Sequence, residues 1–186
     1  MKRIFDLVVA IILLILLSIP MLFIALLVKL TSKGPVLHWS DRIGINNTMF
    51  RMPKFRTMRL NAPTVATHLL DNPKEFLIHC GSFLRRFSLD ELPQLWSVLK
   101  GDMSFIGPRP ALYNQDDLIE LRTKKGLDKL VPGITGWAQV NGRDNLSIPL
   151  KVEYDEYYMK NKSFFLNLKV LYMTFLKVIR AEGVKH

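Results

Sequence analysis

The longest apolar segment of the chain covers residues 7–28, where no side chain is charged. About 20 apolar residues are enough for a helix to cross a lipid bilayer. Pro20 lies inside this segment, however, and an internal proline removes a helical hydrogen bond and favours a bend or a break. Length alone predicts a helix that spans the membrane, whereas Ser18 and Pro20 predict a helix that bends near its middle.

Basic residues flank this segment on both sides, with Lys2 and Arg3 before it and Lys29 and Lys33 after it. Basic flanks are drawn to the cytoplasmic side of a membrane. A helix that enters and leaves by the same face satisfies both the flanking charges and the proline. We therefore expect residues 1–33 to form a re-entrant, monotopic anchor with its linker. A cleavable signal peptide is disfavoured, because the apolar region is too long and no small-residue cleavage site follows it.

A second periodic pattern covers residues 162–180. On a helical wheel the basic residues of this segment fall within an arc of about 80°, and apolar side chains occupy much of the rest. This pattern predicts an amphipathic helix. Its apolar arc is wide enough to pack on the protein core, to lie in the membrane interface, or to do both. Such a surface can also pair with a second copy, so a homodimer is possible.

Between these helices, short alternating runs at residues 37–39 and 49–52 surround Asn46 and Asn47. Alternation on either side of turn residues predicts a small β-hairpin. The expected fold class is therefore mainly α with a minor β-hairpin. Residues 34–186 would form one domain that faces the cytoplasm and ends in the amphipathic helix.

Composition narrows the choice of partner. The chain has 186 residues and a net charge of +10, and its mean hydropathy is +0.15. This length allows one domain and an anchor. The positive charge suits an anionic membrane surface or nucleic acid, but no helix-turn-helix or RNP pattern is present, so we expect no nucleic acid partner. Cys80 is the only cysteine, which excludes an intrachain disulfide and favours a reducing compartment.

The most informative polar cluster begins at Ser88, which Asp90 and Glu91 follow closely. A serine followed three residues later by glutamate is typical of a capping box, so both acids should lie in the first turn of a short helix ending near Lys100. The pair can be a helix cap and nothing more, or it can be a catalytic pair. Arg85, one turn before the acids, favours the second interpretation by adding a nearby cation.

A rigid cationic loop follows at Pro108, Arg109 and Pro110. The two prolines fix backbone φ angles on either side of the arginine. A guanidinium held in a stiff loop is well suited to bind phosphate oxygens. Lys54 and Arg56 belong to an earlier basic cluster, which can be a solvated face or can also contact phosphate.

Three sequence blocks together resemble the small monotopic phosphoglycosyl transferases of bacteria, the bacterial sugar transferase family. They are Lys-Phe-Arg-Thr-Met at residues 54–58, the acidic and Pro-Arg-Pro region at residues 88–110, and Pro-Gly-Ile-Thr-Gly-Trp-Ala-Gln-Val-Asn-Gly-Arg at residues 132–143. The resemblance implies transfer of a sugar 1-phosphate from a UDP-sugar to polyprenyl (undecaprenyl) phosphate, with release of UMP. The reaction would occur at the cytoplasmic face of the bacterial inner membrane, as the first membrane step of glycoconjugate assembly.

The resemblance also implies roles for individual residues. Asp90 would be the nucleophile that forms a phosphosugar–aspartyl intermediate, and Glu91 would help to place the metal or the acceptor. It implies a re-entrant anchor too, although family members usually have adjacent Ser-Pro where this chain has Ser18-Ile19-Pro20. The residues that would bind phosphate, head group, nucleotide or diphosphate are Lys54, Arg56, Arg85, Pro108, Arg109, Pro110 and Arg143.

A carboxylate can approach a diphosphate only when the negative charge of the diphosphate is masked, because two anions repel at close range. We therefore expect Mg²⁺, held by Asp90 and Glu91 together with substrate phosphates. Two other functions stay open: a metal-dependent phosphatase acting on polyprenyl diphosphate, and a basic membrane-binding module without catalysis. Release of UMP from a UDP-sugar would exclude both. No local motif identifies the sugar, because pocket shape decides it.

Overall fold

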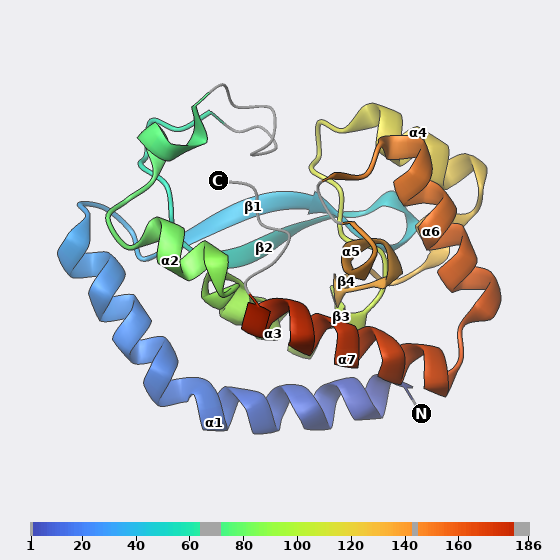
Figure 1. The fold of residues 1–186 in the computed structure, drawn as a ribbon, viewed down its shortest axis with the longest axis horizontal. Coiled ribbons are helices and arrows are strands. Elements are labelled where there is room, and N and C mark those ends of the chain that lie inside the picture. The colour runs from blue at the N-terminus through green and yellow to red at the C-terminus, as the bar shows by residue number, and fades with distance from the viewer. Residues whose placement is uncertain (1, 64–71, 143–144, 181–186) are drawn as a thin grey trace.

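The computed structural model describes residues 2–63, 72–142 and 145–180 of the chain. It is mainly helical with two small sheets (Figure 1), so the predicted mainly α fold with a β-hairpin is confirmed. The elements are α1 (Lys2–Thr31), β1 (Leu37–Ile43), η1 (Ile45–Asn47), β2 (Met49–Phe55), η3 (Pro73–Phe76), α2 (Gly81–Arg86), η4 (Leu89–Gln94), α3 (Leu95–Lys100), β3 (Ser104–Ile106), α4 (Asp116–Lys124), η5 (Leu127–Lys129), β4 (Gly133–Thr135), α5 (Trp137–Val140), α6 (Ile148–Asn161) and α7 (Phe164–Arg180).

Helix α1 is helical throughout its length and contains Pro20. It is long and apolar enough to cross a membrane. In Figure 1 it follows the lower edge of the molecule and then turns upward along the left side. Most of its large apolar side chains are exposed, including Ile15, Leu16 and Phe23 at 66% or more. Such a surface is unfavourable in water and indicates contact with lipid.

The opposite face of α1 packs on the rest of the protein. Ala10 is fully buried in a core cluster with Val98 and Phe105. Further along the helix, Val28 is fully buried in a second cluster with Leu84. The two halves of α1 therefore cover two different parts of the remaining protein, which fixes the helix against it.

The predicted hairpin is confirmed. Strands β1 and β2 pair antiparallel, with His38 opposite Lys54 and Ile43 opposite Met49. The connection contains Asn46 and Asn47, whose φ angles are +53° and +56°. Asparagine tolerates this left-handed region better than most residues, which explains why this pair closes the hairpin.

A second sheet was not predicted from the sequence. Strands β3 and β4 pair in parallel, with Ser104 opposite Gly133 and Ile106 opposite Thr135. Each strand has three residues, too few to show a period in the sequence. The pairing places the Pro-Arg-Pro segment that follows β3 beside the segment that contains β4.

Helix α7 occupies the position of the predicted amphipathic helix. Val170 is fully buried against the first core cluster, whereas Phe165, Leu168 and Phe175 are 80%, 54% and 62% exposed. The wide apolar arc thus contacts protein on one side and stays open on the other. Before α7, the hydroxyl of Tyr158 in α6 donates to Asn167 Oδ1 at 2.9 Å and connects the two helices.

Two leucine substitutions test this arrangement. Leu84→Ala removes a side chain with no exposed surface and should lower the free energy of unfolding by about 2–5 kcal/mol. Leu168→Ala makes the same chemical change at a position 54% exposed and should change stability by less than about 1 kcal/mol. Thermal unfolding in a neutral detergent compares them. Equal losses for the two variants would contradict the assigned core and open faces.

Candidate active site

The two acids lie in η4, a short turn that leads directly into α3. The predicted capping box at Ser88 is wrong: the serine has φ +54° and ψ +22°, and its side chain makes no capping bond. A capping serine needs an extended backbone, which this left-handed conformation excludes. The Glu91 N–H instead donates to the Ser88 carbonyl at 3.1 Å. The result is a tight turn in which Asp90 is only 7% exposed.

Glu91 is the centre of an ion cluster. Its Oε1 accepts from Lys54 Nζ and from Arg109 Nη2, each at 2.8 Å. The three side chains come from η4, from β2 and from the loop after β3, so the cluster joins segments that are distant in sequence. Burial lowers the pKa of Lys54, and the charge of Glu91 acts in the opposite direction.

Further basic residues surround this cluster. Arg42 lies near Lys54 and His38, and Arg85 lies near His38. Partial burial and then these cations lower the pKa of His38, which keeps its imidazole neutral at pH 7. Four basic side chains, Lys54, Arg42, Arg85 and Arg109, face three carboxylates, Asp41, Asp90 and Glu91, so the site has a small excess of positive charge. Such a site suits a multiply charged anion such as a diphosphate.

The loop at residues 108–111 is held by its carbonyl groups. Its two prolines have no N–H to donate, but each of its four carbonyl oxygens accepts a hydrogen bond of 2.8–3.2 Å. In chain order, the donors are the Gly133 N–H, the Arg122 and Arg42 guanidinium groups, and the Ile43 N–H. The loop is therefore fixed from the hairpin, from α4 and from β4, and its position does not depend on substrate.

One of these donors is positioned by a buried ion pair. Arg122 donates to Asp155 Oδ2 from Nε at 3.1 Å and from Nη2 at 2.7 Å. Asp155 is 1% exposed; burial raises its pKa, and Arg122 acts in the opposite direction. Sequence reasoning did not find this pair, because its two members lie on different helices and are 33 residues apart in the chain. The spacing of Val152, Asp155 and Tyr158, all buried on one face of α6, is the signal that could have found it.

Two glycines allow the loop to approach the second sheet closely. A Cβ on Gly107 would lie 2.3 Å from the Val131 carbonyl oxygen, and a Cβ on Gly136 would lie 2.1 Å from that of Gly107. Both contacts are with backbone atoms that cannot move aside, so only glycine fits here. The Gly-Pro-Arg-Pro and Gly-Trp segments thus meet through their backbones.

The other candidate residues are distributed as follows. Arg85 donates from Nε to Thr57 Oγ1 at 2.9 Å and lies beside the cluster. Arg56 is 4% exposed and donates to the carbonyls of Pro35 and Ser32, so the structure places its guanidinium against the linker and not in the cluster. Arg143 lies outside the described residues.

The side-chain ligands near the two acids can be compared with the ligands that the expected Mg²⁺ ion prefers. Among the described residues, no three His, Cys, Asp or Glu side chains gather at one point. Mg²⁺ does not need such a group, because it usually binds one or two carboxylates together with substrate phosphates and waters. The carboxylates of the consecutive residues Asp90 and Glu91 fit that donor chemistry. Zinc is less well suited, because it prefers histidine and cysteine ligands.

Comparison with known proteins supports a common origin over the whole chain. A family model described as bacterial sugar transferase matches residues 1–181. The protein named uncharacterized sugar transferase EpsL, from Bacillus subtilis, is 43% identical over 187 residues, which cover 100% of this chain and 90% of EpsL.

Two further relatives are named for an activity. The UDP-glucose:undecaprenyl-phosphate glucose-1-phosphate transferase of Escherichia coli is 39% identical over 95% of this chain and 40% of its own length. The UDP-N-acetylgalactosamine-undecaprenyl-phosphate N-acetylgalactosaminephosphotransferase of Aeromonas hydrophila is 35% identical over 99% of this chain and 45% of its own length. The chain thus spans less than half of these two proteins but nearly all of EpsL. These matches show that the chain belongs to the bacterial sugar transferase family and is a phosphoglycosyl transferase.

Proposed function

We propose that the protein transfers a sugar 1-phosphate from a UDP-sugar to polyprenyl phosphate, giving a polyprenyl-diphosphate sugar and UMP. The observation that carries this proposal is the placement of Asp90, which is buried beside a carboxylate that Lys54 and Arg109 already neutralise. The names of the E. coli and Aeromonas relatives support the same reaction class. The product would serve as the lipid-linked starting unit of a glycoconjugate.

The reaction divides into two displacements at one phosphorus atom. A carboxylate oxygen of Asp90 attacks the phosphorus that carries the sugar, and the bond from that phosphorus to the UMP oxygen breaks. An oxygen of the polyprenyl phosphate then attacks the same phosphorus, and the bond to Asp90 breaks. Two steps allow one small site to accept a soluble donor and a membrane-bound acceptor in turn.

The cations of the site prepare it for this chemistry. Arg109, fixed by its loop, would bind the diphosphate of the UDP-sugar. Lys54 would also bind this diphosphate and balance part of its negative charge. Arg85 would contact the same phosphate groups from α2. Because Glu91 neutralises two cations, it sets their positions before substrate binds and limits the repulsion between them.

The proposed metal fits this arrangement. Asp90 and Glu91 would hold Mg²⁺ together with the phosphates of the donor, and the ion would mask their negative charge. For Arg56 we propose a structural role in holding the linker to β2, since its donors bind the carbonyls of Pro35 and Ser32.

We also propose that α1 is a re-entrant anchor, which would place the catalytic domain on the cytoplasmic face of the inner membrane. Support comes from Pro20, which cannot donate to the preceding turn. Ser18 Oγ donates to the Ile15 carbonyl at 2.8 Å, and such bonds often accompany helix bends. Both halves of α1 are packed on the domain, which leaves only one face of the helix for lipid.

Asp90→Asn tests the nucleophile. The change nearly preserves size but removes the attacking charge, so UMP release should fall by more than about a thousandfold. The assay uses purified protein, undecaprenyl phosphate and a panel of UDP-glucose, UDP-galactose and UDP-N-acetylhexosamines. The matched control is Asp116→Asn at an exposed position of α4, which should keep full activity.

An Asp90→Asn activity within about tenfold of wild type would exclude Asp90 as nucleophile. Absence of UMP from every donor with the wild-type protein would favour the phosphatase or the binding module.

Removal of divalent cations tests the metal. Excess EDTA should stop UMP release, and Mg²⁺ added beyond the chelator should restore it without zinc. Circular dichroism before and after chelation shows whether the fold is preserved. Undiminished turnover in excess chelator would remove the metal from the scheme.

Pro20→Leu tests the membrane topology. Leucine restores the missing helical hydrogen bond, and the apolar segment is long enough to span the ~30 Å hydrocarbon layer. Part of the variant should then expose its N-terminus to the periplasm and lose activity, while Lys2 and Arg3 oppose full inversion. Labelling of an N-terminal tag in intact cells with an impermeant reagent measures this fraction. Ile19→Leu, a change at the exposed neighbouring position, should behave as wild type. A wild-type N-terminus that is labelled from the periplasm would show a single span.

A further inference from the structure

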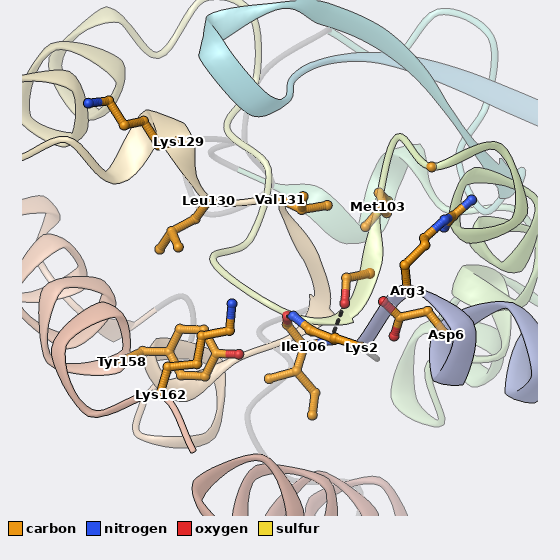
Figure 2. Close-up of a pocket in the computed structure, with 12 residues that line it drawn as sticks. Lys2, Arg3, Asp6, Met103, Ile106, Lys129, Leu130, Val131, Tyr158 and Lys162 are labelled. Atoms are coloured by element: carbon orange, nitrogen blue, oxygen red, sulfur yellow. Dashed lines mark hydrogen bonds between the residues drawn. The ribbon is translucent and has the colours of Figure 1, made fainter. Parts of the chain in front are cut away.

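A separate pocket lies at the beginning of α1 (Figure 2) and has a volume of about 260 Å³. It is bounded by the first turn of α1, by β3 and the turn before it, by the end of η5, and by the junction of α6 and α7. The acids of η4 precede α3, whereas this pocket lies beyond the C-terminal end of α3. Neither Asp90 nor any residue of the ion cluster at Glu91 lines this pocket. The transfer reaction therefore leaves this pocket unexplained.

The pocket is strongly cationic. Of the charged residues that line it, Lys2, Arg3, Lys129 and Lys162 are positive and only Asp6 is negative. Figure 2 shows Lys2 and Lys162 extending toward the same space from different elements, with Lys129 farther out at the edge. Two ammonium groups that approach each other repel, and an anion between them would remove this repulsion.

Several of these groups are held in place before any ligand binds. Lys2 Nζ donates to the Ile106 carbonyl at 2.7 Å. Arg3 donates to the carbonyls of Val98 and Leu99 at the end of α3, at 2.5 and 2.7 Å. These neutral acceptors fix the positions of the side chains but do not neutralise their charge. The positive end of the α1 dipole points in the same direction and adds to the attraction for an anion.

The surroundings of the pocket are apolar and exposed. Ile4 and Phe5, which follow Lys2 and Arg3 in α1, are 67% and 51% exposed. On the other side, Phe164 and Phe165, which follow Lys162, are 74% and 80% exposed. Cations that border an exposed apolar surface are typical of the membrane interface, where lipid phosphates lie directly above the acyl chains.

We propose that this pocket binds the phosphate of an anionic phospholipid head group, such as phosphatidylglycerol, with Lys2 and Lys162 as its principal ligands. The volume is small for a nucleotide sugar, since pockets for ligands of that size usually occupy about 300–1,000 Å³. A phosphodiester head group needs less space, and its acyl chains would lie on Phe5 and Phe164. The bound lipid would fix α1 and α7 at the same depth in the membrane. The inference rests on the proposed monotopic seating and is independent of the transfer reaction.

Binding is tested without donor or acceptor, so that its outcome does not depend on catalysis. Purified protein in a neutral detergent is titrated with short-chain phosphatidylglycerol, short-chain phosphatidylcholine or inorganic phosphate, and the rise in unfolding temperature is recorded. We expect a saturable rise with phosphatidylglycerol only. An equal response to phosphatidylcholine or to inorganic phosphate would overturn the assignment to an anionic lipid.

Charge-removing variants locate the site. Lys2→Gln with Lys162→Gln should weaken phosphatidylglycerol binding by about 30-fold, since each basic residue near a lipid surface contributes about 1 kcal/mol. Lys162→Gln alone should weaken phosphatidylglycerol binding about fivefold. The Lys162 ammonium has no hydrogen bond or ion pair to another described residue, so this variant should keep the fold. The control pair, Lys124→Gln with Arg180→Gln, removes the same charge outside the pocket.

The control pair should bind phosphatidylglycerol as tightly as the wild type does. The proposed site would be overturned if the control pair weakened this binding equally, or if the pocket variants left it unchanged. Competition between undecaprenyl phosphate and phosphatidylglycerol that disappears in the Lys2 and Lys162 double variant would also overturn it, because the pocket would then belong to the acceptor. Loss of UMP release without loss of lipid binding would affect the proposed function and leave this site standing.

Discussion

The ion cluster at Glu91 is the interaction on which the candidate site depends. One carboxylate oxygen accepts from Lys54 of the hairpin and from Arg109 of the Pro-Arg-Pro loop, each at 2.8 Å. Without Glu91, two cations would repel each other in a partly buried space, at a cost that a low local dielectric makes large. Without the cations, Asp90 and Glu91 would repel in the same way. The cluster therefore offsets the repulsion around the buried carboxylate of Asp90, where the proposed diphosphate substrate would bind.

The backbone around Arg109 explains why this geometry is fixed in advance. Prolines cannot donate hydrogen bonds, so the loop is held through its carbonyls by donors from three other segments. One donor, Arg122, is oriented by the buried carboxylate of Asp155. A ligand-binding guanidinium that is fixed before binding loses less conformational entropy when the ligand arrives. The ion pair of Arg122 and Asp155 thus supports the candidate site, although neither residue belongs to the ion cluster at Glu91.

Helix α1 relates this site to the proposed membrane seating. One face packs on two core clusters of the catalytic domain, at Ala10 and at Val28, and the other face exposes large apolar side chains. Helix α7 has the same division, with Val170 buried and Phe165 open. Lipid on both open faces is what the proposed monotopic seating predicts, because amphipathic surfaces of this kind bury their apolar side in the membrane interface.

The sequence by itself determined the features that depend on local physics. Apolar length predicted the long helix α1, alternation around Asn46 predicted the hairpin, and the adjacent acids with the Pro-Arg-Pro segment indicated the candidate site. Tertiary structure decided the rest, because ion pairs and backbone contacts between distant segments leave no period in a sequence. It paired β3 with β4, gave Ser88 a left-handed backbone in place of a cap, turned Arg56 toward the linker, and joined Arg122 to Asp155. Local pattern identified the candidate residues for the chemistry, and long-range packing decided which of them meet.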